Sequence, residues 1–354
     1  MDLPSYISRP VAYILLALVL SAGGAAFKLH YFGTTESSDY IEYVATAHAF
    51  AGESPLEKAP PNRVLKPLAP LLIALLIPFL GDHDATLFQS LVFYLALVAL
   101  MYFFAYEFLR DHYLAFLATL LVSLSYPMLK YGVDIFTETG AIFFYTLSLF
   151  LTLRILRAPR PSLIIINAIV IAVGFLWKEY SIVAGVTFGL VLLFHPTLSR
   201  AEKWKYIFVF GAIGALIAIP WQIFVALKYH YWYGSWYHSN AGPGFAMEFT
   251  LKNVLKSIAA VLGLAWLLVP LGFKKRNFLE VPQTRFLQLS TWPPFMALAW
   301  GYISSRLFYV MAPPILMLGM HGMREWPRRS QTIAAAIIIA ANIAWLFLSY
   351  SIKL

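Results

Sequence analysis

The sequence contains no cysteine and few charged residues. None of its 354 residues is cysteine, so disulfides, thiolate metal ligands and cysteine nucleophiles are excluded. Asp, Glu, Lys and Arg make up 12% of the chain, which is about half of their usual share in a soluble domain. Hydrophobic residues make up 60%, and the mean hydropathy is +0.72. These values exclude a soluble domain and predict a polytopic membrane protein.

Long apolar runs predict membrane-spanning helices. They cover residues 11–26, 87–108, 140–156, 207–227 and 333–350, and a helix of roughly 20 residues crosses a bilayer. Because the runs are continuously apolar rather than alternating, they predict helices and not a closed barrel. The first run lacks a cleavage motif, so we interpret it as a retained anchor. We therefore expect an all-α transmembrane helical bundle.

The net charge of +9 fits the same class. Cytoplasmic loops of membrane proteins collect Lys and Arg, and two apolar runs separate each basic cluster from the next, so the clusters can share one side. The chain lacks the extended polar surface that a nucleic acid would need, and we expect no nucleic-acid partner. The basic clusters are Arg157 and Arg160; Arg200, Lys203 and Lys205; Lys274, Lys275, Arg276 and Arg285; and Arg324, Arg328 and Arg329.

Residues 64–80 form a short apolar segment that three prolines interrupt. If this segment crossed the membrane, every later basic cluster would lie outside. We therefore predict an interfacial or re-entrant segment. About eleven crossings then remain, with a cytoplasmic N-terminus, and two acidic loops share the outer face.

We expect one transmembrane domain over residues 1–354. Its predicted parts are a first outer loop with juxtamembrane helices at 31–84, candidate catalytic spans at 85–199, and C-terminal spans at 200–354. The last part contains an outer loop at 228–253. No internal repeat divides the chain.

Two acidic residues lie at the start of the first outer loop. Asp39 follows the first apolar run, and Glu42 comes one turn later in a predicted amphipathic helix over residues 39–51. The interpretation of Asp39 without a functional role is a solvated helix end. The functional one is a base, because a carboxylate that is ionised near neutral pH can accept the proton of a sugar hydroxyl. We predict Asp39 as a catalytic residue and Glu42 as a weaker substrate-binding candidate.

A second acidic pair, Asp134 and Glu138, lies in the second outer loop. Either residue could cap the following helix, although Glu138 needs a partner at the start of a membrane span. The functional interpretation is an acidic group that orients the acceptor or binds a divalent cation. Two oxygen ligands do not identify a metal. Tyr131, in the same loop, is a weaker substrate-binding candidate.

Cations on the outer face are candidate ligands for a phosphate. Either Lys178 and Glu179 form a self-neutralised pair, or Lys178 is a point-charge ligand for a lipid phosphate and Glu179 holds it in place. Glu179 is also a weaker substrate-binding candidate. Arg306 either snorkels or clamps a phosphate leaving group with its guanidinium. Arg63 and Lys66 are expected to anchor the first loop at the interface, and Arg63 is also a phosphate-binding candidate.

Aromatic residues and histidines fill the outer loop at residues 230–238. They could stack on a sugar or supply a metal ligand, but an ordinary interfacial aromatic belt has the same composition. His238 is a weak substrate-binding candidate.

The order of these features resembles the GT-C superfamily of polytopic glycosyltransferases. The relatives that it resembles are the protein O-mannosyltransferases, the lipid A aminoarabinose transferases and, more remotely, the catalytic subunit of oligosaccharyltransferase. The resemblance covers residues 11–199 well and the C-terminal half loosely. The matching features are Asp39 after the first span, Lys-Pro-Leu-Ala-Pro-Leu at 66–71, the basic turn at Arg110, the acidic second loop, the Lys178-Glu179 turn, and Arg306 before Ala-Pro-Pro at 312–314.

The resemblance implies an inverting transfer of a sugar from a polyprenyl-phosphate or polyprenyl-diphosphate donor. The active site would lie on the extracytoplasmic face of an inner or plasma membrane, and the acceptor would be a glycan, a lipid or a protein. By this resemblance, Asp39 corresponds to the family's acidic residue in the first outer loop. Glu138 or Asp134 corresponds to its acidic residue in the second outer loop. Lys178 and Arg306 fall on donor-phosphate contacts.

The chain also departs from the family pattern. It has a single Asp39 instead of an acidic pair, and it shows no soluble C-terminal domain. Two other interpretations compete with the enzyme: a transporter or flippase of a lipid-linked or small anionic substrate, and a scaffold subunit without activity.

Overall fold

The computed structural model describes residues 9–240, 250–299 and 305–351, and all regular secondary structure in these ranges is helical. The predicted all-α class is confirmed. The first helices are α1 (Arg9–Phe32), α2 (Ser38–Phe50), α3 (Pro61–Val64), α4 (Leu68–Leu109), α5 (His112–Ser123), α6 (Glu138–Arg157), α7 (Pro161–Trp177) and α8 (Ser181–Leu193). They are followed by α9 (Arg200–Tyr229), α10 (Tyr233–Asn240), α12 (Leu251–Leu262), α13 (Val269–Lys274), α14 (Val281–Ser290), α15 (Ser305–Phe308), α16 (Ala312–Gly322) and α17 (Arg328–Ser351).

The described residues contain 6 helical stretches that are long and apolar enough to cross a membrane. Three shorter apolar helices, α5, α7 and α8, accompany them. These lengths do not confirm the predicted count of about eleven spans. Residues 241–249 of the predicted outer loop lie outside the described ranges.

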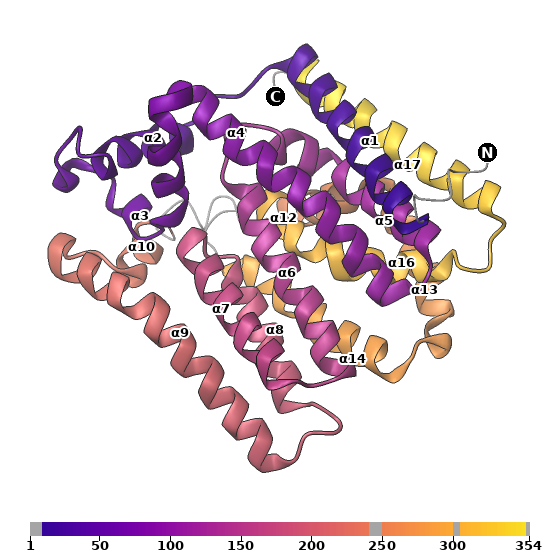
Figure 1. The fold of residues 1–354 in the computed structure, drawn as a ribbon. Coiled ribbons are helices and arrows are strands. Elements are labelled where there is room, and N and C mark those ends of the chain that lie inside the picture. The colour runs from indigo at the N-terminus through magenta and orange to yellow at the C-terminus, as the bar shows by residue number, and fades with distance from the viewer. Residues whose placement is uncertain (1–8, 241–249, 300–304, 352–354) are drawn as a thin grey trace.

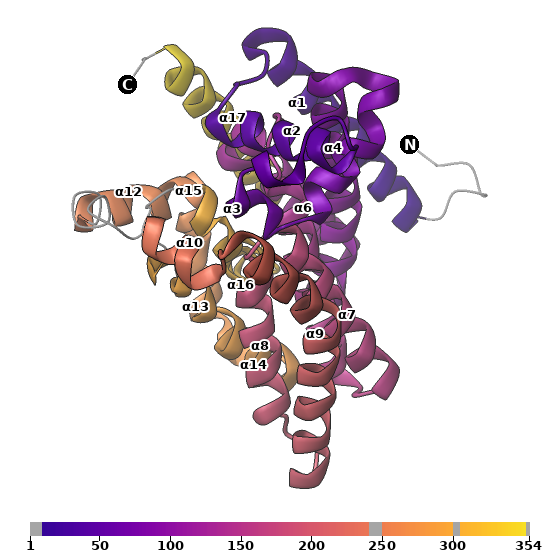
Figure 2. The ribbon, with the colours of Figure 1, turned by 90° about the vertical axis from the view of Figure 1, so that its left-hand side faces the viewer.

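Helix α6 lies inside the bundle and packs against α4, α7 and α8 (Figure 1). Helices α1 and α17, from the two ends of the chain, run side by side along one edge (Figure 1). The rings of Phe32 and Tyr350 stack there with centroids 4.6 Å apart. Helix α9 runs along the opposite edge, beside α7, and Figure 2 views the molecule from that side. The predicted first outer loop, with α2 and α3, lies at one end of the bundle (Figure 1).

Gly81 divides α4 into two helical parts. Its backbone has φ 75° and ψ 171°, a conformation that glycine adopts without a steric penalty. The part before Gly81 lies near the end of α2, where Phe50, Leu68 and Leu71 line one cavity. Residues 68–80 therefore form a helical part distinct from the long second part of α4. This arrangement allows the chain to turn back after the first outer loop.

Candidate active site

Helix α2 carries Asp39 in its first turn. Ser37 caps the helix by accepting a hydrogen bond from the backbone N–H of Tyr40 at 3.3 Å, and an acidic residue is favoured at this end of the helix dipole. The predicted helix over 39–51 is confirmed. Its polar side does not simply face water, however, because Thr46 is fully buried and the side chain of Asp39 is only 20% exposed. The fold directs Asp39 toward the bundle.

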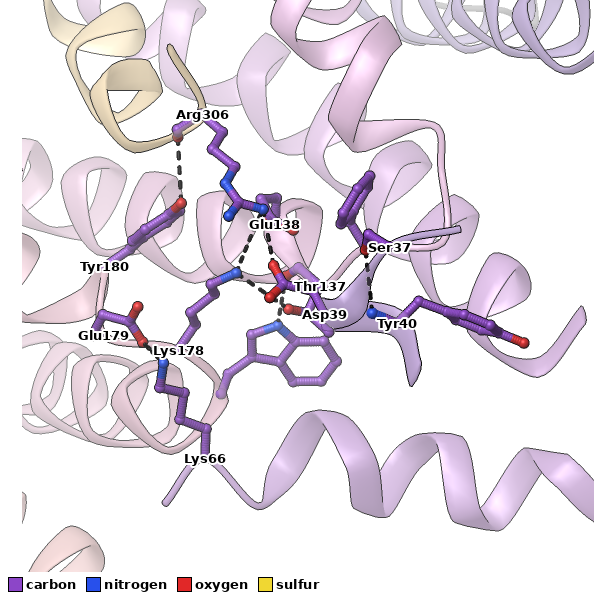
Figure 3. Close-up of polar contacts among 12 residues, drawn as sticks. Ser37, Asp39, Tyr40, Lys66, Thr137, Glu138, Lys178, Glu179, Tyr180 and Arg306 are labelled. Carbon is purple, nitrogen blue, oxygen red and sulfur yellow. Dashed lines mark hydrogen bonds and ion pairs between the residues drawn. The ribbon is translucent and has the colours of Figure 1, made fainter. Parts of the chain in front are cut away.

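Arg306 joins the two acidic loops (Figure 3). Its Nη1 atom lies 2.9 Å from Oδ2 of Asp39 and 3.3 Å from Oε1 of Glu138. Lys178 Nζ reaches the same Glu138 oxygen at 2.7 Å. The predicted convergence of the first and second outer loops is therefore confirmed. Four candidates from distant parts of the chain meet in one cluster.

Arg63 and Lys66 add two further cations to this cluster. The Arg63 guanidinium is ion-paired with Asp39, and its Nε donates to Glu42 Oε2 at 2.7 Å. Lys66 Nζ pairs with Glu179 Oε2 at 2.5 Å. Both cations are buried. The prediction that Arg63 and Lys66 anchor the loop at the interface is therefore wrong.

The expected pairing of Glu179 with Lys178 is also wrong. Lys178 has an extended backbone, with φ −164° and ψ 150°, and successive side chains of extended backbone point in opposite directions. Lys178 therefore faces Glu138, whereas Glu179 faces Lys66 (Figure 3). The Lys-Glu turn links two ion pairs instead of neutralising itself.

The cluster contains four carboxylates and four cations. Burial alone would raise the pKa of Asp39, but the positive charges of Lys178, Arg63 and Arg306 outweigh it and hold that pKa well below its usual range. Asp39 is therefore ionised at neutral pH. The members are Asp39, Glu42, Glu138 and Glu179, with Arg63, Lys66, Lys178 and Arg306.

Asp134 lies apart from this cluster. It forms a fully buried ion pair with Lys28 of α1 at 2.8 Å and accepts a hydrogen bond from the backbone N–H of Thr35. These contacts tie the end of the first span to the second outer loop. The sequence left Glu138 and Asp134 as alternatives for the second acid, and the geometry favours Glu138.

Replacement of Lys28 by Met tests this structural role of Asp134. The variant leaves a buried carboxylate without its cation, and we expect it to lower the free energy of unfolding by about 3 kcal/mol. Thermal unfolding in detergent would measure the loss. A Lys28→Met/Asp134→Asn double variant should recover part of it, because the uncompensated charge is gone. Equal stability of both variants and the wild type would show that the pair contributes nothing.

The weaker candidates divide between the site and the surface. Tyr131 lines a small pocket beside Glu138 and Arg306. The Oε2 atom of Glu138 is buried and has no hydrogen-bond partner among the described residues. His238 is exposed on α10, and none of the cluster's described contacts involves it. The pocket beside Tyr131 therefore offers a hydrogen-bond acceptor, Oε2 of Glu138, next to the guanidinium of Arg306.

The possible divalent cation finds no ready site among the described residues. Within residues 9–240, 250–299 and 305–351, no group of three His, Asp or Glu side chains is arranged to hold a metal ion. The cluster's carboxylates instead contact Arg and Lys.

Sequence reasoning missed two members of the site. Lys66 was assigned to the interface, although a cation inside an apolar segment is itself a signal of a buried partner. Tyr43 was not considered. Its hydroxyl is buried without a hydrogen-bond partner in the described part of the chain, and the Arg63 guanidinium lies 4.6 Å from its ring centre. One helical turn separates Tyr43 from Asp39, so the helix pattern could have indicated a shared face.

The chain is similar to known proteins in part of its sequence and in its fold. Residues 60–224 match the family described as dolichyl-phosphate-mannose-protein mannosyltransferase. The structure also resembles the crystal structure of ArnT from Cupriavidus metallidurans bound to undecaprenyl phosphate, with a TM-score of 0.63 and 12% sequence identity over 93% of this chain. The chain is therefore similar to that mannosyltransferase family over residues 60–224 and has the same overall fold as ArnT.

The chain spans 64% of the length of the ArnT structure. A search of curated protein sequences found no match. The residues of the family match include Arg63, Glu138 and Lys178, whereas Asp39 and Arg306 lie outside it. The cluster therefore brings together residues from inside and outside the matched range.

Proposed function

We propose that this chain is a membrane glycosyltransferase that transfers a sugar from a polyprenyl-phosphate donor to an acceptor at the extracytoplasmic face. The observation that carries the proposal is Arg306, which contacts both Asp39 and Glu138 beside Lys178. A base and two phosphate-binding cations are thereby held within reach of one small volume. The bundle of about eleven spans, the cytoplasmic N-terminus and the outward orientation belong to the same proposal.

The chemistry is a single displacement with inversion. Asp39 accepts the proton of the acceptor hydroxyl while the hydroxyl oxygen forms a bond to the anomeric carbon. The bond from that carbon to the lipid phosphate breaks, and the phosphate leaves with the electron pair. Lys178 and Arg306 stabilise the charge that develops on it, and Arg63 holds Asp39 in position. Glu138 orients both cations through its Oε1 atom.

Donor binding also strengthens the base. A phosphate oxygen has to compete with carboxylates for Lys178 and Arg306, because both cations are already paired. The contact between Arg306 and Asp39 is the one that can be exchanged, since Asp39 keeps Arg63. When Arg306 turns to the phosphate, the pKa of Asp39 rises and its affinity for the acceptor's proton increases.

An apolar cavity beside the cluster supports a lipid-linked donor. The cavity has a volume of about 530 Å³ and is lined by residues that include Phe50, Leu71, Leu75, Phe144 and Trp177. Trp177 directly precedes Lys178 in the chain. The carrier's apolar tail can occupy this cavity and the surrounding lipid while its phosphate reaches the cations. The fold of ArnT, which was crystallised with undecaprenyl phosphate, supports the same donor class.

The full chain in proteoliposomes tests the proposal directly. It would be supplied with a polyprenyl-phosphate donor carrying a radiolabelled sugar, together with membranes of the source cells as a mixture of acceptors. We expect label to move to the acceptor fraction and free polyprenyl phosphate to accumulate. Movement of the intact donor across the bilayer, without cleavage of the sugar–phosphate bond, would instead identify a flippase. If the label is neither transferred nor moved across the bilayer, the result would favour a scaffold subunit.

A further inference from the structure

The backbone between Arg63 and Lys66 is held by helix α9. Val64 ends α3 and Leu65 follows as its C-cap, and both residues are fully buried. Carbonyls at a helix C-terminus have no partner within the helix and need one from elsewhere. Trp221 Nε1 donates to the Val64 carbonyl at 2.7 Å, and Gln222 Nε2 donates to the Leu65 carbonyl at 3.0 Å.

The rest of the outer end of α9 holds the same loop. The hydroxyl of Tyr229 donates to the Leu56 carbonyl at 2.5 Å, and Lys228 pairs with Glu57 at 2.7 Å. These contacts surround a small core, separate from the main one, that includes Val64, Leu65, Val225 and Trp221. The loop from Leu56 to Lys66 is thus fixed from outside the bundle, by a helix that comes much later in the chain (Figure 1).

The two clamped carbonyls lie between two cations that face different partners. Arg63 contacts Asp39 and Glu42 on α2, while Lys66 contacts Glu179 at the turn between α7 and α8. The Lys66 ammonium also lies 4.8 Å from the Trp236 ring centre on α10. A shift of the Val64 and Leu65 carbonyls would displace both cations together. Displacements of about 1 Å are enough to reduce catalysis strongly.

We propose that Trp221 and Gln222 are positioning residues for the candidate active site. They cap the end of α3 and thereby set the places of Arg63 and Lys66 relative to the donor's phosphate. This inference rests on the proposed function. It assigns a role to the outer end of α9, a helix whose one buried residue is Val225.

The test uses variants that remove the two donors with little change in shape. Trp221→Phe keeps an aromatic ring without the N–H group, and Gln222→Met keeps the length of the side chain without the amide. A lost neutral hydrogen bond changes an equilibrium by roughly threefold to tenfold. We expect each single variant to raise the KM for the donor by about that factor and the double variant by about thirtyfold. The kcat at saturating donor should fall as well, because Arg63, which holds Asp39 in position, is displaced.

Hydrogen exchange supplies a readout independent of activity. In the double variant, the amides of residues 63–66 should exchange about tenfold faster than in the wild type, because the segment opens more often. Ile223→Met is the matched control, since Ile223 is 52% exposed on the same helix. It should leave both the KM and the exchange rate unchanged.

The outcomes separate the inference from the proposed function. Faster exchange with an unchanged KM would show that α9 holds the loop without positioning the cations, and would overturn the inference. Unchanged exchange and unchanged KM would also overturn it. A wild-type chain without transfer activity would instead overturn the proposed function, and the exchange rates would then still decide whether α9 clamps this segment.

Discussion

Replacing Asp39 with Asn is expected to reduce the rate of sugar transfer by about 10³-fold. The amide has nearly the shape of the carboxylate but cannot take the acceptor's proton. The fold should tolerate the change, because Arg63 keeps Glu42 and Arg306 keeps Glu138 as partners. Initial rates with the radiolabelled donor in proteoliposomes would measure the loss, and size-exclusion chromatography would verify the folded state.

Asp84→Asn is the matched control for this variant. Asp84 belongs to the same predicted outer loop, its side chain is 70% exposed, and it contacts His83 instead of the cluster. The control removes the same charge from the same region and should keep nearly the full rate. If Asp39→Asn retained a third or more of the wild-type rate, another group would have to serve as the base, and the proposed mechanism would be wrong.

The convergence of the acidic loops could be predicted because it depends on topology. The prolines in residues 64–80 indicated a segment that does not cross, and this alone placed Asp39 and Glu138 on one face. Lys178 and Arg306 were candidates because of their positions at span boundaries, whereas the burial of Lys66 was missed. The structure adds that one residue, Arg306, contacts both acids.

The pairing within the site could not be predicted, because it depends on local backbone geometry. Lys178 and Glu179 are adjacent in the sequence, yet the extended backbone at Lys178 sends their side chains to different partners. The partner of Asp134 was missed for a different reason. Lys28 lies beyond the apolar run that marked the first span, whereas α1 continues to Phe32 and carries this cation into contact.

Breaks within helical segments limited the prediction of the number of membrane spans. Gly81 and Gly263 both adopt positive φ values and interrupt helical segments. A hydropathy pattern does not register such breaks, because it averages over the residues on either side. The number of spans is therefore less accessible from the sequence than the fold class.

Replacing Arg306 with Gln is expected to lower kcat/KM for the donor by about 10³-fold at pH 8. Arg306 is the one residue that contacts both Asp39 and Glu138 among the ion pairs of the cluster. In the proposed mechanism it also stabilises the departing phosphate. At pH 8 Asp39 is ionised with or without Arg306, so protonation of Asp39 does not contribute to the loss measured there.

The pH profile of Arg306→Gln tests the other effect of this arginine, which is to lower the pKa of Asp39. Lys178, Arg63 and Arg306 together lower the pKa of Asp39 against the opposing effect of burial. Removing one of them must raise that pKa, so a larger fraction of Asp39 becomes protonated as the pH falls. The acid limb of kcat/KM should therefore move to higher pH, and the loss relative to the wild type should grow as the pH falls toward the raised pKa of Asp39.

Arg306→Lys distinguishes charge from geometry. The ammonium keeps the positive charge near Asp39, so the acid limb should stay close to that of the wild type. It lacks the planar fork of a guanidinium, which has several donors to share between carboxylates and a phosphate, so a loss of about 10²-fold should persist at every pH. An acid limb that moves equally in Arg306→Lys and Arg306→Gln would mean that the charge of Arg306 does not govern Asp39. The exchange of Arg306 from the base to the departing phosphate would then have to be abandoned.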